Sequence, residues 1–202
     1  ASAMLPAKLV NAQPGEKILD MCAAPGGKST AIGAALKGEG LLISNDISKS
    51  RAKALLRNLE GFGIINSIVV SEYPEKLSRY FPEFFDKVLI DAPCSGEGMF
   101  HKEPSMTESW LRMGPEEYHK LQMEILTYGA KMVRPGGKLI YSTCTFSPEE
   151  DEGSIAWFLR EHPDFHLVEV NDDEDLCGCH CIDHGHPEWA DGNPELTKTR
   201  RL

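Results

Sequence analysis

The sequence predicts an α/β fold built on a mostly parallel sheet with helices on both faces. Short apolar segments of strand length alternate along the chain with longer segments whose apolar residues recur at helical spacing. Two strand segments, residues 85–93 and 138–144, are almost unbroken apolar runs, which is typical of strands buried on both faces of a parallel sheet. The 202 residues are enough for one well-buried α/β domain, whereas two full domains would be a tight fit.

The expected elements follow one another from the N-terminus. A helical segment over residues 1–10 precedes the first strand. Strands are expected at residues 16–22, 40–46, 66–71, 85–93, 138–144 and 164–170. Helices are expected at residues 27–38, 48–63, 116–133 and 147–162, with Ser48 and Ser147 as N-caps and Glu150 three residues past the second cap. Residues 95–115 show no clear period, and loops of that length in compact domains are usually functional.

The composition indicates a soluble globular protein. Hydrophobic residues make up 41 % of the chain, and no run approaches the roughly 18 apolar residues of a membrane span. We find no secretory leader pattern, so we expect a cytoplasmic protein with no membrane association. Its six cysteines are then expected to be thiols or ligands rather than a disulfide framework. A net charge of −10 argues against binding nucleic acid by global electrostatics alone, but it leaves room for a local basic surface.

The stretch "LDMCAAPGGKST", residues 19–30, predicts a ligand loop at the end of the first strand. It is not a triphosphate-binding P-loop, because the first glycine of that motif would fall at position 22, which is Cys22. Gly26 and Gly27 allow the backbone to approach a ligand, and Asp46, at the end of the second strand, stands where a carboxylate binds a ribose diol. The pattern fits a nucleoside without a phosphate cluster, such as S-adenosyl-L-methionine. The alternative is a tight strand–helix turn with a solvated Asp46.

Two cysteines follow the apolar strands. Cys94 comes after residues 85–93, and Cys144 closes the segment 138–144. If these strands are neighbours, about 4.8 Å apart, both thiols lie at the ligand edge of the sheet. A single cysteine there would be taken as structural, but two beside a cofactor loop favour chemistry.

Four segments resemble the Nop/Sun family of RNA cytosine-5 methyltransferases, and in particular its bacterial ribosomal-RNA branch, the RsmF-like proteins. They are "DMCAAPGGKST", "NDISKSRAKALLRN", "FDKVLIDAPCSGEGMFHKEP" and "GGKLIYSTCTFSPEEDE", and the resemblance covers most of residues 1–160. It implies the Rossmann-like fold of class I S-adenosylmethionine-dependent methyltransferases, with the final strand of the sheet expected to be absent. It also implies a catalytic domain over residues 1–170 and an irregular acidic tail over residues 171–202 that leads to a missing C-terminal segment.

The resemblance implies roles for individual residues. Cys144 is expected to be the nucleophile that adds to carbon-6 of cytosine, Cys94 to assist removal of the carbon-5 proton and release of the enzyme, and Asp91 to bind the base edge. The methyl donor is expected to contact Cys22, Ala23, Ala24, Pro25, Gly26, Gly27, Lys28, Asp46, Arg51 and Asp91. The implied partner is RNA, specifically 16S ribosomal RNA, bound by a monomer. The alternatives are transfer RNA, or a small molecule or protein with both cysteines merely structural.

Several assignments stay open at this stage. Lys102 is expected to touch RNA phosphate, whereas Lys120 is expected to be a solvated charge. Trp110 either contacts a flipped base or anchors its loop on the core. Glu72, Ser71 or backbone would read the adenine of the donor. The Cys/His residues of the tail, Cys177, Cys179, Cys181, His184 and His186, alternate rather than following zinc spacing, and we expect no metal.

The sequence also leaves open what lowers the pKa of the Cys144 thiol. The helix expected near Ser147 points its positive end that way, but Glu149, Glu150 and Asp151 in its first turn oppose a further negative charge. Lys28 or the cationic donor could supply the missing positive charge.

Overall fold

The computed structural model describes residues 2–171 and 182–201. The chain divides into two compact units. The first unit consists of Ala1–Ala92 and Ile125–Ser142, and the second of Pro93–Glu124 and Thr143–Leu202. The expected boundary after residue 170 stays a prediction.

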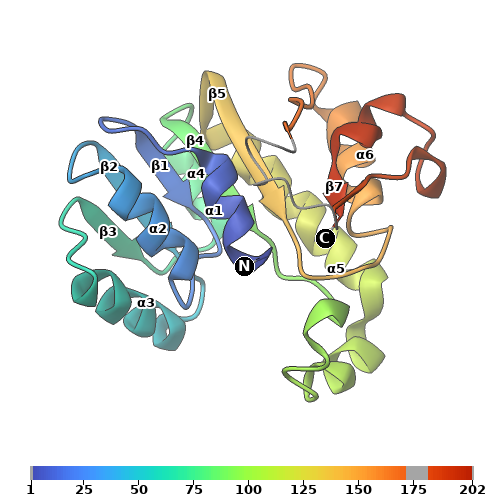
Figure 1. Ribbon diagram of the computed structural model, residues 1–202, viewed down its shortest axis with the longest axis horizontal. Helices are drawn as coiled ribbons and strands as arrows, with labels where there is room; N and C mark the ends of the chain where they lie inside the picture. Colours follow the sequence, from blue (N-terminus) through green and yellow to red (C-terminus); the bar gives the residue numbers. More distant parts are fainter. Residues whose placement is uncertain (1, 172–181, 202) are drawn as a thin grey trace. The chain divides into compact units, whose positions relative to one another are not determined.

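The first unit contains a five-stranded, all-parallel sheet. Its strands are β1 (Lys17–Asp20), β2 (Leu41–Asn45), β3 (Ser67–Val70), β4 (Phe85–Asp91) and β5 (Val133–Ser142). They lie in the order β3-β2-β1-β4-β5 (Figure 1). The order reverses between β1 and β4, and ligands of such sheets bind at the carboxyl ends of the strands at this point.

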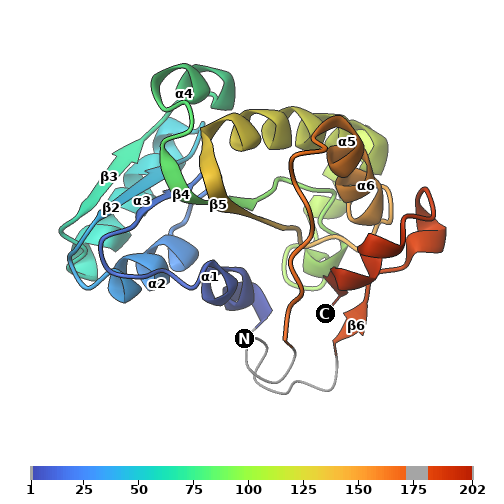
Figure 2. The same ribbon diagram turned by 90° about the horizontal axis from the view of Figure 1, so that it is seen from above.

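Helices cover both faces of this sheet, as the sequence predicts. They are η1 (Ser2–Met4), α1 (Leu5–Val10), α2 (Gly27–Ala35), α3 (Lys49–Gly61), α4 (Pro74–Tyr80) and residues 125–132 of α5 (Met106–Met132). Figure 2 shows α1 and α2 on one face and α4 and the C-terminal end of α5 on the other. The core between α1, α2, α3 and the sheet is made of fully buried aliphatic residues such as Ile18, Leu42, Leu55 and Leu89. The short helix α4, which begins at Pro74, was not expected from the sequence.

The regular structure described in the second unit is mostly helical. It contains η2 (Glu97–Met99), residues 106–124 of α5, α6 (Glu152–Glu161), η3 (Pro187–Trp189) and η4 (Pro194–Lys198). The strands β6 (Asp183–His184) and β7 (Arg200–Arg201) form an antiparallel pair. Helix α5 starts ten residues before the expected position, because Gly114 (φ 69°, ψ 172°) interrupts the helix just ahead of Pro115 and hides its first part from the periodicity. No helix in the described part of the chain is long and apolar enough to cross a bilayer.

Two further expectations for this unit are wrong. Residues 164–170 form no strand, since the carbonyls of Leu167 and Val170 accept hydrogen bonds from the side chains of Lys198 (3.3 Å) and Arg200 (2.9 Å). Helix α6 begins at Glu152, not at Ser147. Ser147 donates its hydroxyl to Glu149 at 2.6 Å instead of capping a helix, and Glu150 is bonded to Ser95.

Candidate active site

The loop after β1 requires glycine at position 26. Gly26 precedes α2 with φ +109°, a conformation that residues with a Cβ rarely adopt. A Cβ at this position would also lie 2.8 Å from Cδ1 of Leu55. Gly27 is less constrained, since a Cβ there would meet only the Met4 sulfur, at an ordinary van der Waals distance of 3.8 Å. The first glycine therefore shapes the loop, and the second leaves space above it.

Side chains of helix α3 hold this loop by donating hydrogen bonds to the backbone carbonyls of the loop. Arg51 donates from Nη2 to the carbonyl of Ala24 at 2.9 Å, and Asn58 donates from Nδ2 to the carbonyl of Pro25 at 2.7 Å. Asp46 is buried and pairs with Arg51 at 3.2 Å while accepting the backbone N–H of Ser48 at 2.9 Å. These contacts fix the loop from its outer side.

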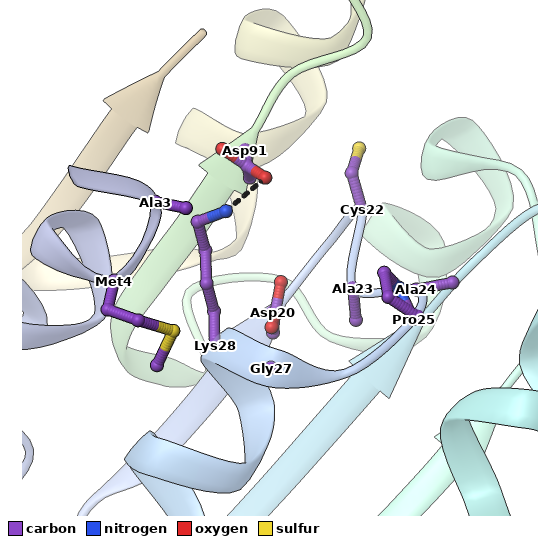
Figure 3. Close-up of a pocket in the computed structure, with 10 residues that line it drawn as sticks. All are labelled: Ala3, Met4, Asp20, Cys22, Ala23, Ala24, Pro25, Gly27, Lys28 and Asp91. Carbon is purple, nitrogen blue, oxygen red and sulfur yellow. Dashed lines mark hydrogen bonds and ion pairs between the residues drawn. The ribbon is translucent and has the colours of Figure 1, made fainter. Parts of the chain in front are cut away.

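A cavity of about 200 Å³ opens beside the loop (Figure 3). Ten residues line it: Ala3, Met4, Asp20, Cys22, Ala23, Ala24, Pro25, Gly27, Lys28 and Asp91. Seven of these were predicted from the sequence as donor contacts. Among the predicted contacts, Gly26, Asp46 and Arg51 are not part of this lining. Ala3, Met4 and Asp20 were missed; Asp20 was detectable as the carboxylate that ends β1 just before the loop, whereas nothing in the sequence pointed to Ala3 or Met4.

Lys28 and Asp91 form an ion pair across this cavity. The Lys28 Nζ lies 2.5 Å from Oδ2 of Asp91, and Figure 3 shows the two side chains pointing at each other. The other oxygen of Asp91 accepts the hydroxyl of Ser142 at 2.7 Å. Asp91 is thus held in one orientation at the carboxyl end of β4.

Asp20 offers the cavity a buried carboxylate. Its Oδ2 accepts the hydroxyl of Ser29 at 2.6 Å, while Oδ1 has no hydrogen-bond partner among the described residues. Burial raises the pKa of Asp20 to about 7. A buried carboxylate oxygen without a partner favours binding of a cationic group that can donate a hydrogen bond to it. The ammonium of an amino-acid ligand is such a group. The cavity therefore fits the amino-acid end of S-adenosylmethionine.

The second unit brings the two predicted cysteines together. The sulfur atoms of Cys94 and Cys144 are 3.3 Å apart, and the backbone N–H of Cys144 points to the Cys94 sulfur at 3.3 Å. Cys94 is buried and Cys144 is exposed. The hydrogen bond to Cys144, together with burial, raises the pKa of the Cys94 thiol. Cys94 is therefore held as a neutral thiol beside the accessible sulfur of Cys144.

Other predicted contacts have identifiable surroundings. Lys102 is exposed in the turn after η2, and Lys120 pairs with Glu117 at 2.6 Å on the surface. The Trp110 indole donates to Glu97 at 2.7 Å from a half-buried position in α5, and its contact with a base stays a prediction.

The adenine and metal assignments stay predictions. Glu72 pairs with Lys76 at 2.6 Å, and Ser71 donates to the carbonyl of Ile47 at 3.3 Å. Cys177, Cys179 and Cys181 lie outside the described residues. Within the described ranges, no three metal-ligating side chains cluster.

A Rossmann-like parallel sheet with a glycine loop after its first strand defines the class: an S-adenosylmethionine-dependent methyltransferase fold. The family model for the 16S rRNA methyltransferase RsmB/F matches residues 7–181, so the chain belongs to this family. This confirms the fold class, the family resemblance and the predicted cofactor.

Individual relatives agree with this assignment. The chain is 37 % identical over 166 residues to the ribosomal RNA small subunit methyltransferase F of Escherichia coli K12, a match covering 81 % of this chain and 35 % of that protein. It thus spans about a third of the length of the curated relatives it matches. A methyltransferase homologue from Pyrococcus horikoshii has a TM-score of 0.78 at 29 % identity, covering 100 % of this chain and 60 % of the other. NSun6 from the same organism, solved with the S-adenosylmethionine analogue SFG, has a TM-score of 0.73 at 31 % identity, covering 84 % and 42 %.

Proposed function

We propose that this chain carries the catalytic part of a methyltransferase that methylates carbon-5 of a cytosine in RNA, with small-subunit ribosomal RNA as the substrate. The observation that carries the proposal is the pair of cysteine sulfurs 3.3 Å apart, one exposed and one buried. The ribosomal substrate is supported by the family and by the name of the Escherichia coli relative.

Two thiols suit this chemistry because carbon-5 of cytosine is a poor nucleophile. Addition of the Cys144 thiolate to carbon-6 makes the ring enamine-like, so that carbon-5 can displace the methyl group from a sulfonium. A base assisted by Cys94 then takes the carbon-5 proton. The electron pair of that carbon–hydrogen bond forms the 5,6 double bond as the carbon–sulfur bond breaks, so that sulfur leaves as the Cys144 thiolate. Cys94 assists this second half. Asp91 stabilises the protonated ring nitrogen as charge develops during the addition.

The donor is held by residues of the first unit. Asp20 binds its ammonium through the unpartnered Oδ1, and the loop from Cys22 to Lys28 contacts its amino-acid part. Lys28 orients Asp91 through their ion pair. Asp46 binds the ribose, and Arg51 supports the loop through the Ala24 carbonyl. S-adenosylmethionine supplies the electrophilic methyl group when bound.

The test is a pair of cysteine variants assayed on small-subunit ribosomal RNA that lacks the modification. Cys144→Ala should lower turnover on the order of a thousandfold or more, because the addition step is lost. Cys94→Ala should accumulate a protein–RNA adduct that survives denaturing electrophoresis, because release is blocked.

The double variant Cys94→Ala/Cys144→Ala is the control, and it should form no adduct. Full turnover by Cys144→Ala would contradict the proposal and favour a substrate for which both cysteines are structural. Mapping of 5-methylcytosine by bisulfite sequencing then identifies the modified position.

A further inference from the structure

The two cysteines lie on two short segments whose separation has to be fixed by contacts from other residues. Residues 93–96 carry Cys94 and residues 143–147 carry Cys144; we call them the thiol segments. Neither segment is part of a regular helix or strand, so the strand-to-strand hydrogen bonds of β4 and β5 end before these segments and do not fix their separation. The Cys144 N–H points at the Cys94 sulfur, and the N–H of Gly98 donates to the Cys144 carbonyl at 2.9 Å.

The carboxylate of Glu150 bonds to both thiol segments. It accepts the backbone N–H of Ser95 at 3.0 Å and forms a short hydrogen bond with the Ser95 hydroxyl. The Thr145 hydroxyl lies 3.4 Å from the same carboxylate, while its shorter hydrogen bond goes to Glu97. Ser95 directly follows Cys94 and Thr145 directly follows Cys144, so one buried carboxylate reaches the residue next to each sulfur.

A second layer holds Glu150 itself. The buried amide of Gln122 donates to Glu150 at 2.7 Å and to the carbonyl of Pro93 at 3.0 Å. Ser154 donates to Gln122 at 3.0 Å and lies 2.9 Å from Nδ1 of His119. Gln122 and Glu150 together bond to the residues on both sides of Cys94.

We propose that Glu150 is a positioning residue that holds the two thiol segments in register and so keeps the Cys94 and Cys144 sulfurs in contact. The inference rests on the proposed function, because it assigns the purpose of this geometry to the two-thiol mechanism. Glu150→Gln replaces one carboxylate oxygen with an NH2 group, which cannot accept, so the Ser95 and Gln122 donors around it are left to share one acceptor oxygen in a buried place.

Neighbouring acids have different partners. Glu149 is exposed and bonds to Ser147. Asp151 bonds to Thr143 at 2.6 Å and pairs with Arg201 at 3.3 Å. Glu97 accepts from the same two hydroxyls as Glu150, but Glu150 in addition accepts the Ser95 backbone N–H. Among Glu149, Glu150 and Asp151, Glu150 is thus the residue that contacts both thiol segments.

The test measures how strongly the protein favours a disulfide between Cys94 and Cys144. The chain is equilibrated with reduced and oxidised glutathione, where two protein thiols and one oxidised glutathione give one protein disulfide and two reduced glutathiones. The disulfide is quantified by mass after alkylation and digestion. In Glu150→Gln, the equilibrium constant should fall at least tenfold, because the new NH2 group faces the donors of Ser95 and Gln122 and the two sulfurs are held together less firmly.

Glu149→Gln is the matched control, with the same chemical change one residue away, and it should keep the equilibrium constant of the parent chain. Binding of the donor is measured in parallel, since its cavity lies in the first unit, and should stay unchanged in both variants. If Glu150→Gln loses donor binding as well, the variant has unfolded, and Thr145→Val then carries the test with an expected threefold loss.

An unchanged equilibrium constant in folded Glu150→Gln, or in Thr145→Val when the first variant unfolds, overturns the proposal. The readout needs no RNA and no methyl transfer. A failure of the proposed function therefore appears in the cysteine assay on RNA, while a failure of this inference appears in the glutathione equilibrium. When the chain does methylate RNA, Glu150→Gln should lower kcat and leave the KM of the donor unchanged.

Discussion

The donor cavity and the thiol segments both bury carboxylates, but the two regions treat them differently. At the cavity, Asp20 is fully buried and one of its oxygens has no partner among the described residues. In the second unit, Glu150 and Glu152 are equally buried, and each accepts several hydrogen bonds. A buried polar atom without a partner costs about 1–3 kcal/mol. The unpartnered oxygen indicates a place for a ligand, whereas the bonded carboxylates hold the protein itself together.

Arg201→Met tests the structural half of this comparison and has the largest expected effect. Arg201 pairs with Glu152, whose side chain is 1 % exposed, through both guanidinium Nε (2.8 Å) and Nη2. Breaking a buried pair by removing one partner costs about 3–5 kcal/mol, because the remaining charge is left buried. We expect a loss near the lower figure in urea denaturation, since Arg201 is partly exposed and Glu152 keeps the His186 N–H at 3.1 Å.

Arg160→Met is the matched control in the same unit. Its pair with Glu161 is exposed on both sides, so its removal should change the free energy of unfolding by less than about 1 kcal/mol. Hydrogen bonds from Arg201 and His186 outweigh burial and keep the pKa of Glu152 low in the parent chain. The loss in Arg201→Met should therefore shrink as the pH falls and Glu152 becomes protonated. Equal losses in the two variants would contradict a structural role for buried charge here.

Asp20→Asn tests the ligand half. Burial, and to a smaller extent the charge of Asp91, raise the pKa of Asp20 from 3.8 to about 7, while the Ser29 hydrogen bond and Lys28 act in the opposite direction. A carboxyl with a raised pKa contributes most stability while it is protonated, and this contribution is lost as the pH rises through about 7. Between pH 5 and 8, the parent chain should lose about 2–3 kcal/mol of unfolding free energy from this group. Asp20→Asn should lack that loss.

Binding of the methyl donor should offset the free-energy cost of ionising Asp20, because a bound ammonium favours the ionised form of this carboxyl group. Donor affinity measured by calorimetry should increase with pH through about 7 in the parent chain and not in Asp20→Asn. Asp151, whose pKa burial also raises to about 7, titrates in both proteins, so the comparison isolates Asp20. Asp86→Asn is the control: its pKa is lowered, despite burial, by bonds from Lys17 N–H and Arg134, and its titration falls below this window. Identical pH profiles for the parent and Asp20→Asn would contradict the assignment.

Gly26→Ala tests whether the cavity depends on backbone shape. With φ +109° and Leu55 Cδ1 at 2.8 Å, the new methyl group should cost about 1–3 kcal/mol and weaken donor binding at least tenfold. Gly61→Ala is the control, because a Cβ at that helical position meets nothing within 4 Å. It should stabilise the chain by about 0.5–1 kcal/mol. Unchanged donor affinity in Gly26→Ala would show that the loop adapts.

The parts of this molecule predicted from the sequence are those with local patterns. The five sheet strands are short apolar runs, and the glycine loop and both cysteines stand directly after such runs. Helix α4 was not predicted because its seven residues are too few to show a helical period. The first part of α5 was not predicted because Gly114 interrupts the helix. The partners of Glu150 could not be predicted, since Ser95 lies 55 residues away and such pairing leaves no local pattern.

Asn58→Ala has the smallest expected effect, and it tests how much an uncharged hydrogen bond to the loop contributes to stability and to binding of the methyl donor. Asn58 donates to the Pro25 carbonyl at 2.7 Å from an exposed helix surface. A neutral hydrogen bond contributes about 0.5–1.5 kcal/mol, so the loss should be near 1 kcal/mol, with donor affinity reduced about threefold by a looser loop. Arg57→Ala on the same helix is the control, since Arg57 is exposed and lies outside the residues that line the donor cavity or bond to its loop. If Asn58→Ala lowered stability but left donor affinity intact, the bracing by α3 would serve folding alone, and the cavity would owe its shape to Gly26.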